Sequence, residues 1–368
     1  MGRTRLRDLN IIIGTLSPGQ ENAITDVPGV LVGQKTLVYD EPRAARTGVT
    51  VIVPREGNIW RDHVYAGFHS FNGCGEMTGV QWLTESGLLC YPIALTCTHQ
   101  VGTVDEAVLA YGRERNLTDI SALPVVGETW DGWLNDADGF HIKRKHIYEA
   151  LDSAVPGPVA EGNTGGGTGM ICHGFKGGTG TASRVIETGS GTFTVGALVQ
   201  ANHGSRDDFR VDGVPVGRLL DRRRTPTPFD DFDSEPGTGG SSILTIIGTD
   251  APLLPHQCTR LAKRATIGVA RVGGIGHNGS GDLFLAFATG NHYPADVDNQ
   301  LDVRTIPGHH MNPLFVATAE AVEEAILNAV TSAETTVGYL GRTALALPLD
   351  ELQEIMDRNA PWRGEKNG

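Results

Sequence analysis

The feature that most constrains this fold is an abrupt change of composition at Ser241-Ser242. Residues 205–240 are rich in charge, proline and glycine, and after Leu220 they show little apolar periodicity. This composition predicts an exposed flexible linker over about residues 205–241. Directly after it, residues 243–247 read Ile-Leu-Thr-Ile-Ile, which predicts a buried strand. A polar linker that ends on a hydroxyl residue at the start of a core strand is the layout expected of a self-cleaving precursor.

The rest of the chain predicts alternating strands and helices. Apolar runs bounded by turn residues predict strands at residues 48–54, 92–96 and 192–199. Thr103 and Glu106 have the spacing of a capping box, which predicts a helix through about Arg113. Asn312 and Pro313 are typical of a helix start, and apolar residues follow them at helical spacing. We therefore expect an α/β or α+β chain with helices packed on sheets.

The composition of the chain limits the classes of function that we expect for it. The chain has 368 residues, enough for one large domain or for two, and its formal net charge of -13 disfavours nucleic acid or an anionic membrane as a partner. No window reaches the apolar length of a membrane span. Five cysteines without a C-x-x-C pair suit a reducing compartment. We expect a cytoplasmic protein that acts on small molecules or peptides.

Several familiar catalytic motifs are absent from the sequence. There is no G-x-S-x-G nucleophile elbow, no H-E-x-x-H metal motif and no G-x-x-x-x-G-K-[ST] phosphate loop, in spite of 49 glycines. The histidines are scattered without ligand spacing, so neither a catalytic metal nor a cofactor is expected. A serine can also be activated by its own α-amine when it is the first residue of a chain. Ser242 is placed to become such a residue.

Five segments together carry a resemblance to a known family. They are residues 22–30 (Asn-Ala-Ile-Thr-Asp-Val-Pro-Gly-Val), 162–170 (Gly-Asn-Thr-Gly-Gly-Gly-Thr-Gly-Met), 175–184 (Phe-Lys-Gly-Gly-Thr-Gly-Thr-Ala-Ser-Arg), 249–256 (Thr-Asp-Ala-Pro-Leu-Leu-Pro-His) and 278–287 (Asn-Gly-Ser-Gly-Asp-Leu-Phe-Leu-Ala-Phe). The chain resembles the L-aminopeptidase/D-esterase family, which includes the β-peptidyl aminopeptidases. Each segment alone is unspecific, but their combination, spread over nearly the whole chain, is highly specific.

The resemblance implies a fold and a processing event. The fold would be a four-layer α/β/β/α sandwich like that of N-terminal-nucleophile hydrolases, formed by a single large domain. Family members are cut before a serine eight residues ahead of the Asp in the Thr-Asp-Ala-Pro motif, which here is Asp250 and gives Ser242. The products would be a larger chain of residues 1–241 and a smaller chain of residues 242–368. Cleaved pairs would assemble into a homo-oligomer, expected to be a tetramer.

The resemblance also implies roles for individual residues. Ser242 would form the acyl-enzyme. Ser280 would form a hydrogen bond with Ser242 and transfer a proton there, and Asp282 would orient Ser280. Asn202 would donate to the oxyanion, which acyl transfer requires. Glu128 would pair with the ammonium group of a peptide, amide or ester substrate. Without the resemblance, Ser280 and Asp282 fit a tight turn, Asn202 fits a turn after a strand, and Glu128 fits a surface loop.

Three positions depart from the family pattern. Trp130 stands where Tyr or Asn is expected, although an indole N–H could serve as a second oxyanion donor. Cys74 and Cys97 stand where asparagine is expected, and both could reshape the acyl pocket. Two alternatives to the aminopeptidase therefore stay open, a self-processing N-acyltransferase of similar fold and an uncleaved binding protein that has lost the activity.

Overall fold

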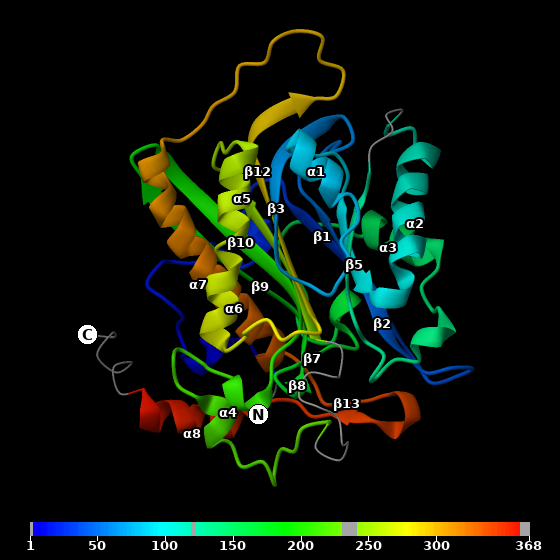
Figure 1. Cartoon of the computed structure of the whole chain (residues 1–368), viewed down its shortest axis with the longest axis vertical. Helices are drawn as coiled ribbons and strands as arrows, with labels where there is room; N and C mark the ends of the chain where they lie inside the picture. Colours follow the sequence, from blue (N-terminus) through cyan, green and yellow to red (C-terminus); the bar gives the residue numbers. More distant parts are fainter. Residues whose placement is uncertain (1–2, 119–122, 230–240, 361–368) are drawn as a thin grey trace.

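Two β-sheets stacked face to face form the centre of the molecule (Figure 1). The computed structural model describes residues 3–118, 123–229 and 241–360. One sheet has the order β1 (Leu31–Tyr39), β2 (Ala45–Val53), β5 (Ile93–Cys97), β6 (Val125–Thr129). The other has the order β4 (Leu88–Leu89), β3 (Asp62–Gly73), β12 (Ser280–Pro294), β11 (Ser241–Thr249), β10 (Gly191–Asn202), β9 (Gly178–Thr188).

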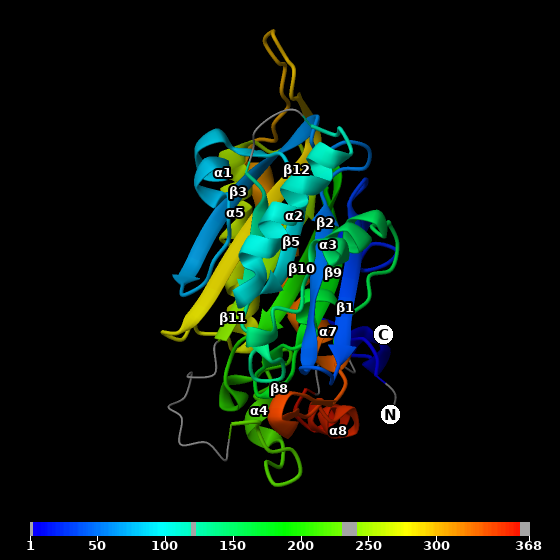
Figure 2. The same ribbon diagram turned by 90° about the vertical axis from the view of Figure 1, so that its right-hand side faces the viewer.

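Helices cover the outer face of each sheet. On the four-stranded sheet lie α2 (Val101–Glu114) and α3 (Arg144–Asp152), and on the six-stranded sheet lie α5 (Pro255–Ala262), α6 (Ala265–Val272) and α7 (Met311–Thr331). Figure 1 shows the helix and sheet layers side by side, and Figure 2 looks onto the face covered by α2 and α3. This arrangement confirms the expected α/β/β/α sandwich. No helix in the described part of the chain has the length and hydropathy needed to cross a membrane.

Smaller elements lie at the ends of the sandwich. They are α1 (Val80–Ser86), α4 (Val216–Leu219), α8 (Leu349–Asn359), the hairpin of β7 (Ile171–Cys172) and β8 (Phe175–Lys176), and the hairpin of β13 (Thr336–Val337) and β14 (Thr343–Ala344). Figure 1 shows β7, β8, α4 and β13 gathered at the lower end of the sheets. This is also the end at which β11 begins, because Asn202, which stands opposite Ser242, bonds to Ile171 of β7.

The alternation of side chains along β11 decides which way Ser242 points. Successive side chains of a strand face opposite sides of the sheet. Ile243 and Ile247 belong to the core beneath the helices α5 to α7, whereas Leu244 and Ile246 belong to the core shared with the four-stranded sheet. Ser242 therefore shares the face of Leu244, between the two sheets, and Ser241 shares the opposite face.

The elements predicted from local patterns are present with small shifts. The strands predicted at 48–54, 92–96, 192–199 and 243–247 are β2, β5, β10 and β11. The helix predicted from the capping box is α2, which begins at Val101, slightly before Thr103. The helix predicted from Asn312 is α7, which begins at Met311.

The predicted linker is wrong over its first part. Phe209, Val211, Val214 and Val216 are fully buried in the core beneath the helices, and Val216 begins the short helix α4. The reason is that apolar residues in irregular turns can fill a core without following a helical or strand repeat. A search for such repeats in the sequence therefore does not detect them. The remaining part of the predicted linker, residues 230–240, lies outside the described residues.

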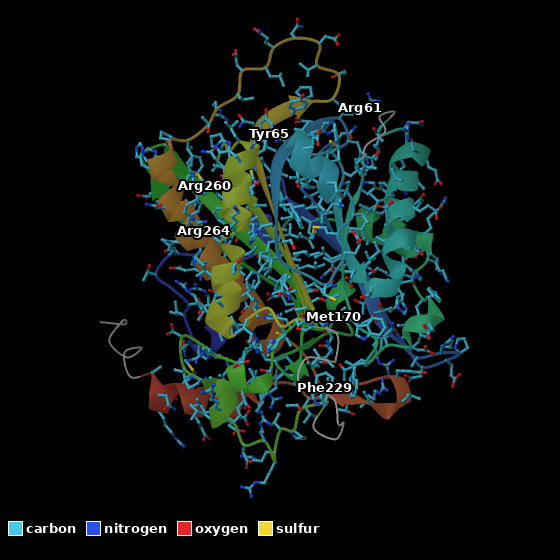
Figure 3. The ribbon with its side chains drawn as sticks, viewed as in Figure 1. Arg61, Tyr65, Met170, Phe229, Arg260 and Arg264 are labelled. Carbon is cyan, nitrogen blue, oxygen red and sulfur yellow. The ribbon has the colours of Figure 1, made fainter. Side chains whose placement is uncertain are left out.

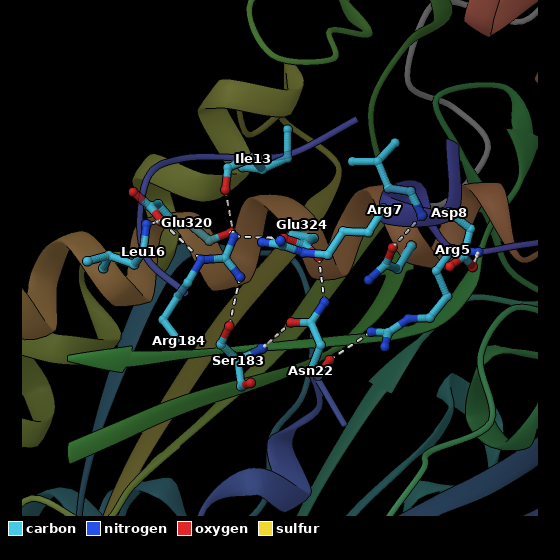
Figure 4. A network of polar contacts seen from close by, with 12 residues as sticks. Arg5, Arg7, Asp8, Ile13, Leu16, Asn22, Ser183, Arg184, Glu320 and Glu324 are labelled. Atoms are coloured by element: carbon cyan, nitrogen blue, oxygen red, sulfur yellow. Dashed lines mark hydrogen bonds and ion pairs between the residues drawn. The ribbon is translucent and has the colours of Figure 1, made fainter. Parts of the chain in front are cut away.

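A buried ionic network joins the N-terminal segment to the sandwich (Figure 4). Arg184 of β9 is fully buried and donates to Glu320 and Glu324 of α7. Arg7 pairs with Glu324 from the other side, and the side-chain amide of Asn22 donates to the same carboxylate. Because each buried carboxylate has charged or polar partners, the cost of burying it is offset, and the network holds β9, α7 and the N-terminal segment in register.

Candidate active site

Strand register brings the expected catalytic residues to one end of β11. In the antiparallel pair of β10 and β11, Asn202 stands opposite Ser242. In the parallel pair of β11 and β12, Ser242 stands opposite Gly281 and Ser241 stands opposite Ser280. Three segments that are far apart in the sequence therefore meet at the Ser241-Ser242 peptide bond.

The hydroxyl of Ser242 is in contact with the peptide bond that self-cleavage would break. Ser242 Oγ donates a 2.6 Å hydrogen bond to the carbonyl oxygen of Ser241 and accepts one of 3.2 Å from the backbone N–H of Gly281. The residue is only 4% exposed. A buried hydroxyl held against the carbonyl group of the preceding residue is close to the position needed for an intramolecular attack.

Ser280 and Asp282 form a tight pair beside Ser241. Ser280 Oγ donates a 2.6 Å hydrogen bond to Asp282 Oδ1 and lies 3.3 Å from Ser241 Oγ. Burial raises the pKa of the Asp282 carboxyl, against the opposing effects of the Ser280 hydrogen bond, the Ile243 N–H and His277. The expected pairing of Asp282 with Ser280 is present. In the described part of the uncut chain, the pair faces Ser241 rather than the hydroxyl of Ser242.

Asn202 is held from both ends of its side-chain amide. Its Oδ1 accepts a 2.8 Å hydrogen bond from the N–H of Ile171, and its Nδ2 donates a 3.0 Å bond to the carbonyl of Trp130. These bonds fix which end of the amide is the donor end. Strand pairing then sets this fixed amide beside Ser242, where a hydrogen-bond donor for an oxyanion is needed.

Glu128 lies on β6, across the gap between the sheets. Its carboxylate accepts hydrogen bonds from the N–H of Glu76, at 2.9 Å, and from the hydroxyl of Thr98. A Cβ atom placed on Gly75 would lie 3.0 Å from Gly281 Cα and 3.3 Å from Glu128 Oε1, so the carboxylate and Gly281 flank Gly75. Burial raises the pKa of Glu128 despite these two hydrogen bonds. Glu128 is therefore a buried acid close to Ser242 and not a surface loop charge.

Trp130 contributes its backbone to the site. Its carbonyl receives the Asn202 amide, while its ring packs edge-on against His99 with ring centroids 5.0 Å apart. Gly132 leaves room for the ring, because a Cβ there would lie 2.1 Å from the indole. The partly exposed ring is thus a wall of the site.

The two departing cysteines occupy different environments. Cys74 is exposed, and its backbone N–H donates a 3.1 Å bond to the carbonyl of Ser280. Cys97 is buried in the core between the sheets, beside Asp131 and Thr47, and burial raises the pKa of its thiol well above the ordinary value. A thiol of this kind stays protonated and is a poor nucleophile.

An aromatic contact lies beside the residue that holds Asn202. Phe229 packs edge-on against Trp133 with ring centroids 4.8 Å apart, and both rest on a small apolar cluster that includes Ile171. Figure 3 shows Phe229 and Met170 at the same end of the sandwich. Phe229 and Trp133 therefore lie close to Ile171, whose N–H bonds to Asn202.

Sequence reasoning missed two groups in this site. The backbone N–H of Gly281 bonds to Ser242, and the hydroxyl of Thr98 bonds to Glu128. Gly281 stands in the segment 278–287, but the strand register had to be known before its N–H could be placed against Ser242.

One group of potential metal ligands exists among the described residues. It consists of Cys172, His173 and His203, and His203 directly follows Asn202.

Comparison of the sequence with known proteins gives a consistent set of relatives. The profile of Peptidase family S58 matches residues 22–344. The beta-peptidyl aminopeptidase BapA of Sphingosinicella microcystinivorans is 46% identical, with 96% of this chain and 92% of the relative covered. BapA of Sphingosinicella xenopeptidilytica is 42% identical, with 98% and 92% covered.

Comparison of the structure gives the same picture. A beta-aminopeptidase of Burkholderia sp. superposes with a TM-score of 0.90 at 48% identity, over 97% of this chain and 99% of the other. The L-aminopeptidase D-Ala-esterase/amidase of Ochrobactrum anthropi, described as a prototype for the serine aminopeptidases and a variant of the Ntn hydrolase fold, superposes with a TM-score of 0.89 at 42% identity, over 96% and 98%. The likeness thus spans both sheets and both helix layers.

Proposed function

The chain belongs to peptidase family S58 and is a serine aminopeptidase with the Ntn hydrolase fold, and from this premise we propose that Ser242 is its nucleophile. The observation that carries the proposal is the hydrogen bond from Ser242 Oγ to the carbonyl of Ser241. The neighbouring Gly281 N–H holds the same oxygen from the other side. Nucleophile and target carbonyl are therefore already in contact inside one chain.

Self-cleavage would proceed in two steps. Ser242 Oγ leaves its hydrogen bond and attacks the carbonyl carbon of Ser241. Collapse of the tetrahedral intermediate breaks the bond from that carbon to the Ser242 nitrogen, so the acyl group moves to the Ser242 oxygen and the hydroxyl proton is transferred to the nitrogen. Water then hydrolyses the ester. The products are a carboxylate on Ser241 and a free α-amine on Ser242, and the second product is the base that an N-terminal serine uses.

The same groups would serve the mature enzyme. The α-amine of Ser242 accepts the proton of its own hydroxyl, Ser242 forms the acyl-enzyme, and Asn202 donates to the oxyanion. Departure of Ser241 leaves the Ser280-Asp282 pair beside the new amine, because Ser280 contacts Ser241 in the uncut chain. We assign Ser280 to hydrogen bonding and proton transfer at this amine, with Asp282 orienting Ser280.

The proposed substrates are peptides, amides and esters that have a free amino terminus. A buried carboxylate near the nucleophile favours an ammonium group through charge-assisted hydrogen bonds, and Glu128 supplies it. The relatives are named as aminopeptidases or as an aminopeptidase and esterase/amidase. Neither an acyltransferase nor an uncleaved binding protein is favoured by any of these observations.

Replacement of the two junction serines tests the proposal. Ser242→Ala should stop both self-cleavage and hydrolysis of amino-acid p-nitroanilides, with a fall in kcat of at least about a thousandfold. Ser241→Ala is the matched control, because it removes only a hydroxyl that contacts Ser280. It should leave cutting largely intact. Loss of cutting in Ser241→Ala with retention in Ser242→Ala would assign the nucleophile to Ser241 instead.

We also propose a cytoplasmic homo-oligomer of cleaved pairs. All five cysteines are free thiols, which suits a reducing compartment. The neighbouring helices α6 and α7 expose Ile267 and Val316, which a subunit contact would cover. Light scattering on the purified protein should give a mass near four cleaved pairs, and a mass of one pair would contradict the tetramer.

A further inference from the structure

A second cluster of reactive side chains lies beside Asn202 at the end of β10. Cys172 ends β7, His173 follows it, and His203 follows β10 directly after Asn202. All three are buried, and one ligand atom of each lies within 4.8 Å of the others. The mechanism above uses none of them.

His173 presents a nitrogen lone pair to the inside of this cluster. Its Nδ1 forms a 2.9 Å hydrogen bond with the carbonyl of Ser205, and a carbonyl only accepts, so Nδ1 carries the proton. Nε2 is then an acceptor, and it is buried without a hydrogen-bond partner in the described part of the chain. Metal-binding histidines have this arrangement, with the other nitrogen anchored to a carbonyl.

Cys172 and His203 have the separation of two ligands of one ion. Cys172 Sγ lies 3.8 Å from His203 Nδ1. Bonds of about 2.3 Å to sulfur and 2.0 Å to nitrogen at a trigonal angle place two such ligands about 3.7 Å apart. The rings of His173 and His203 are 5.1 Å apart at an angle of 68°. The ligand atoms of all three residues lie within 4.8 Å of one another, close enough for one ion to contact all of them.

The charges around the cluster select the kind of ion. Lys176 and Arg206 lie nearby, and Asp208 is the acidic group facing His173. A divalent ion on one thiolate would leave a net positive charge in this buried, already cationic place, which is costly. A monovalent ion would form a neutral complex.

We propose that Cys172, His173 and His203 bind a soft monovalent metal ion, copper(I), in a three-coordinate site. One sulfur and two imidazole nitrogens suit copper(I), whereas structural zinc takes four ligands. The ion replaces the thiol proton, which is released to the buffer, so that Cu⁺ and the thiol give a neutral thiolate complex and H⁺. Because Ile171 N–H bonds to Asn202, the ion would tie β7 to the end of β10 directly behind the oxyanion residue.

The test is copper content of the full-length protein. The Cys74→Ser background removes the exposed thiol that could bind copper adventitiously. Protein expressed with copper in the medium, and purified without oxygen over immobilised bicinchoninate, should retain one copper per chain by mass spectrometry. The metal-loaded protein should also unfold at a higher temperature than the metal-free protein, because the ion binds the folded state only.

Matched variants decide the outcome. Cys172→Ser and His173→Gln should each lose the copper, whereas Cys258→Ser, which removes another fully buried thiol, should keep it. Two cluster variants are used so that a folding defect in one leaves the other to decide, with circular dichroism as the check. Copper retained by both, or none retained by the parent protein, would overturn the site. Equal retention of zinc would overturn the assignment to a monovalent ion.

Discussion

Glu128 is the side chain whose replacement separates amine recognition from acyl transfer. Glu128→Gln should leave self-cleavage nearly normal, because the Ser241-Ser242 bond presents no free amine. Hydrolysis of an amino-acid p-nitroanilide should fall by about 1.5 to 3 kcal/mol of transition-state stabilisation, or roughly 10- to 150-fold in kcat/KM. The N-acetylated substrate, already poor, is the control and should lose little further. Equal proportional losses on the two substrates would show that Glu128 does not read the amine.

The same residue sets a pH dependence. Glu128 must be ionised to pair with an ammonium group, and burial raises its pKa above the ordinary value of 4.5. As pH falls through this raised pKa, the carboxylate is protonated and the pairing is lost. The kcat/KM of free-amine substrates should therefore begin to decline at a pH above 4.5. Glu128→Gln should remove this acidic limb, and an unchanged limb would assign it to another group.

The identities of the site residues could be predicted, but not all of their contacts. Family resemblance was sufficient to select Ser242, Asn202 and Glu128, which the structure brings together at one end of β11. That Ser280 faces Ser241 in the uncut chain follows from the parallel register of β11 and β12. Register depends on long-range packing, which local sequence does not encode. For the same reason, nothing in the local sequence indicates that Cys172 and His203 lie close together. Only the fold shows it.

The close approach of β9 and α7 gives a prediction about the packing of a helix on a sheet. A Cβ on Gly180 of β9 would lie 2.0 Å from the carbonyl oxygen of Ala325 and 2.6 Å from the nitrogen of Ala329, both in α7. Gly180→Ala must therefore push the helix off the sheet, at a cost of about 1 to 3 kcal/mol or more. Thermal unfolding should show a Tm several degrees below that of the wild type.

Gly102 of α2 is the matched control for this substitution. A Cβ there meets nothing within 4 Å. Gly102→Ala removes backbone freedom from the unfolded chain and should be neutral or stabilising by up to about 1 kcal/mol. If both variants unfold at the wild-type temperature, the tight packing of β9 on α7 is not a determinant of stability.

At the element scale, periodic segments were predictable and aperiodic ones were not. The helix α7 and the strand β11 carry clear repeats and lie where the patterns place them. Residues 209–216 lack a repeat and read as linker, yet their apolar side chains are fully buried. Composition alone could not distinguish an irregular core segment from a released loop.

For the whole molecule, the physical patterns in the sequence predict only a fold that contains both helices and strands. The division into two sheets and the four-layer order came from family resemblance, and the structure confirms them. The reason is that β10, β11 and β12 look alike locally, while their antiparallel and parallel pairings join residues that are distant in sequence. Such pairings are properties of the complete chain.

The central claim is that the molecule is made as one chain and becomes active by cutting before Ser242. Intact mass measurement of the purified, denatured protein tests this most directly. The account predicts two chains, residues 1–241 and 242–368, with Ser242 as the first residue of the smaller one, and a single uncut chain in Ser242→Ala. Full-length wild-type chain that persists after long incubation while the protein hydrolyses amino-acid amides would contradict it.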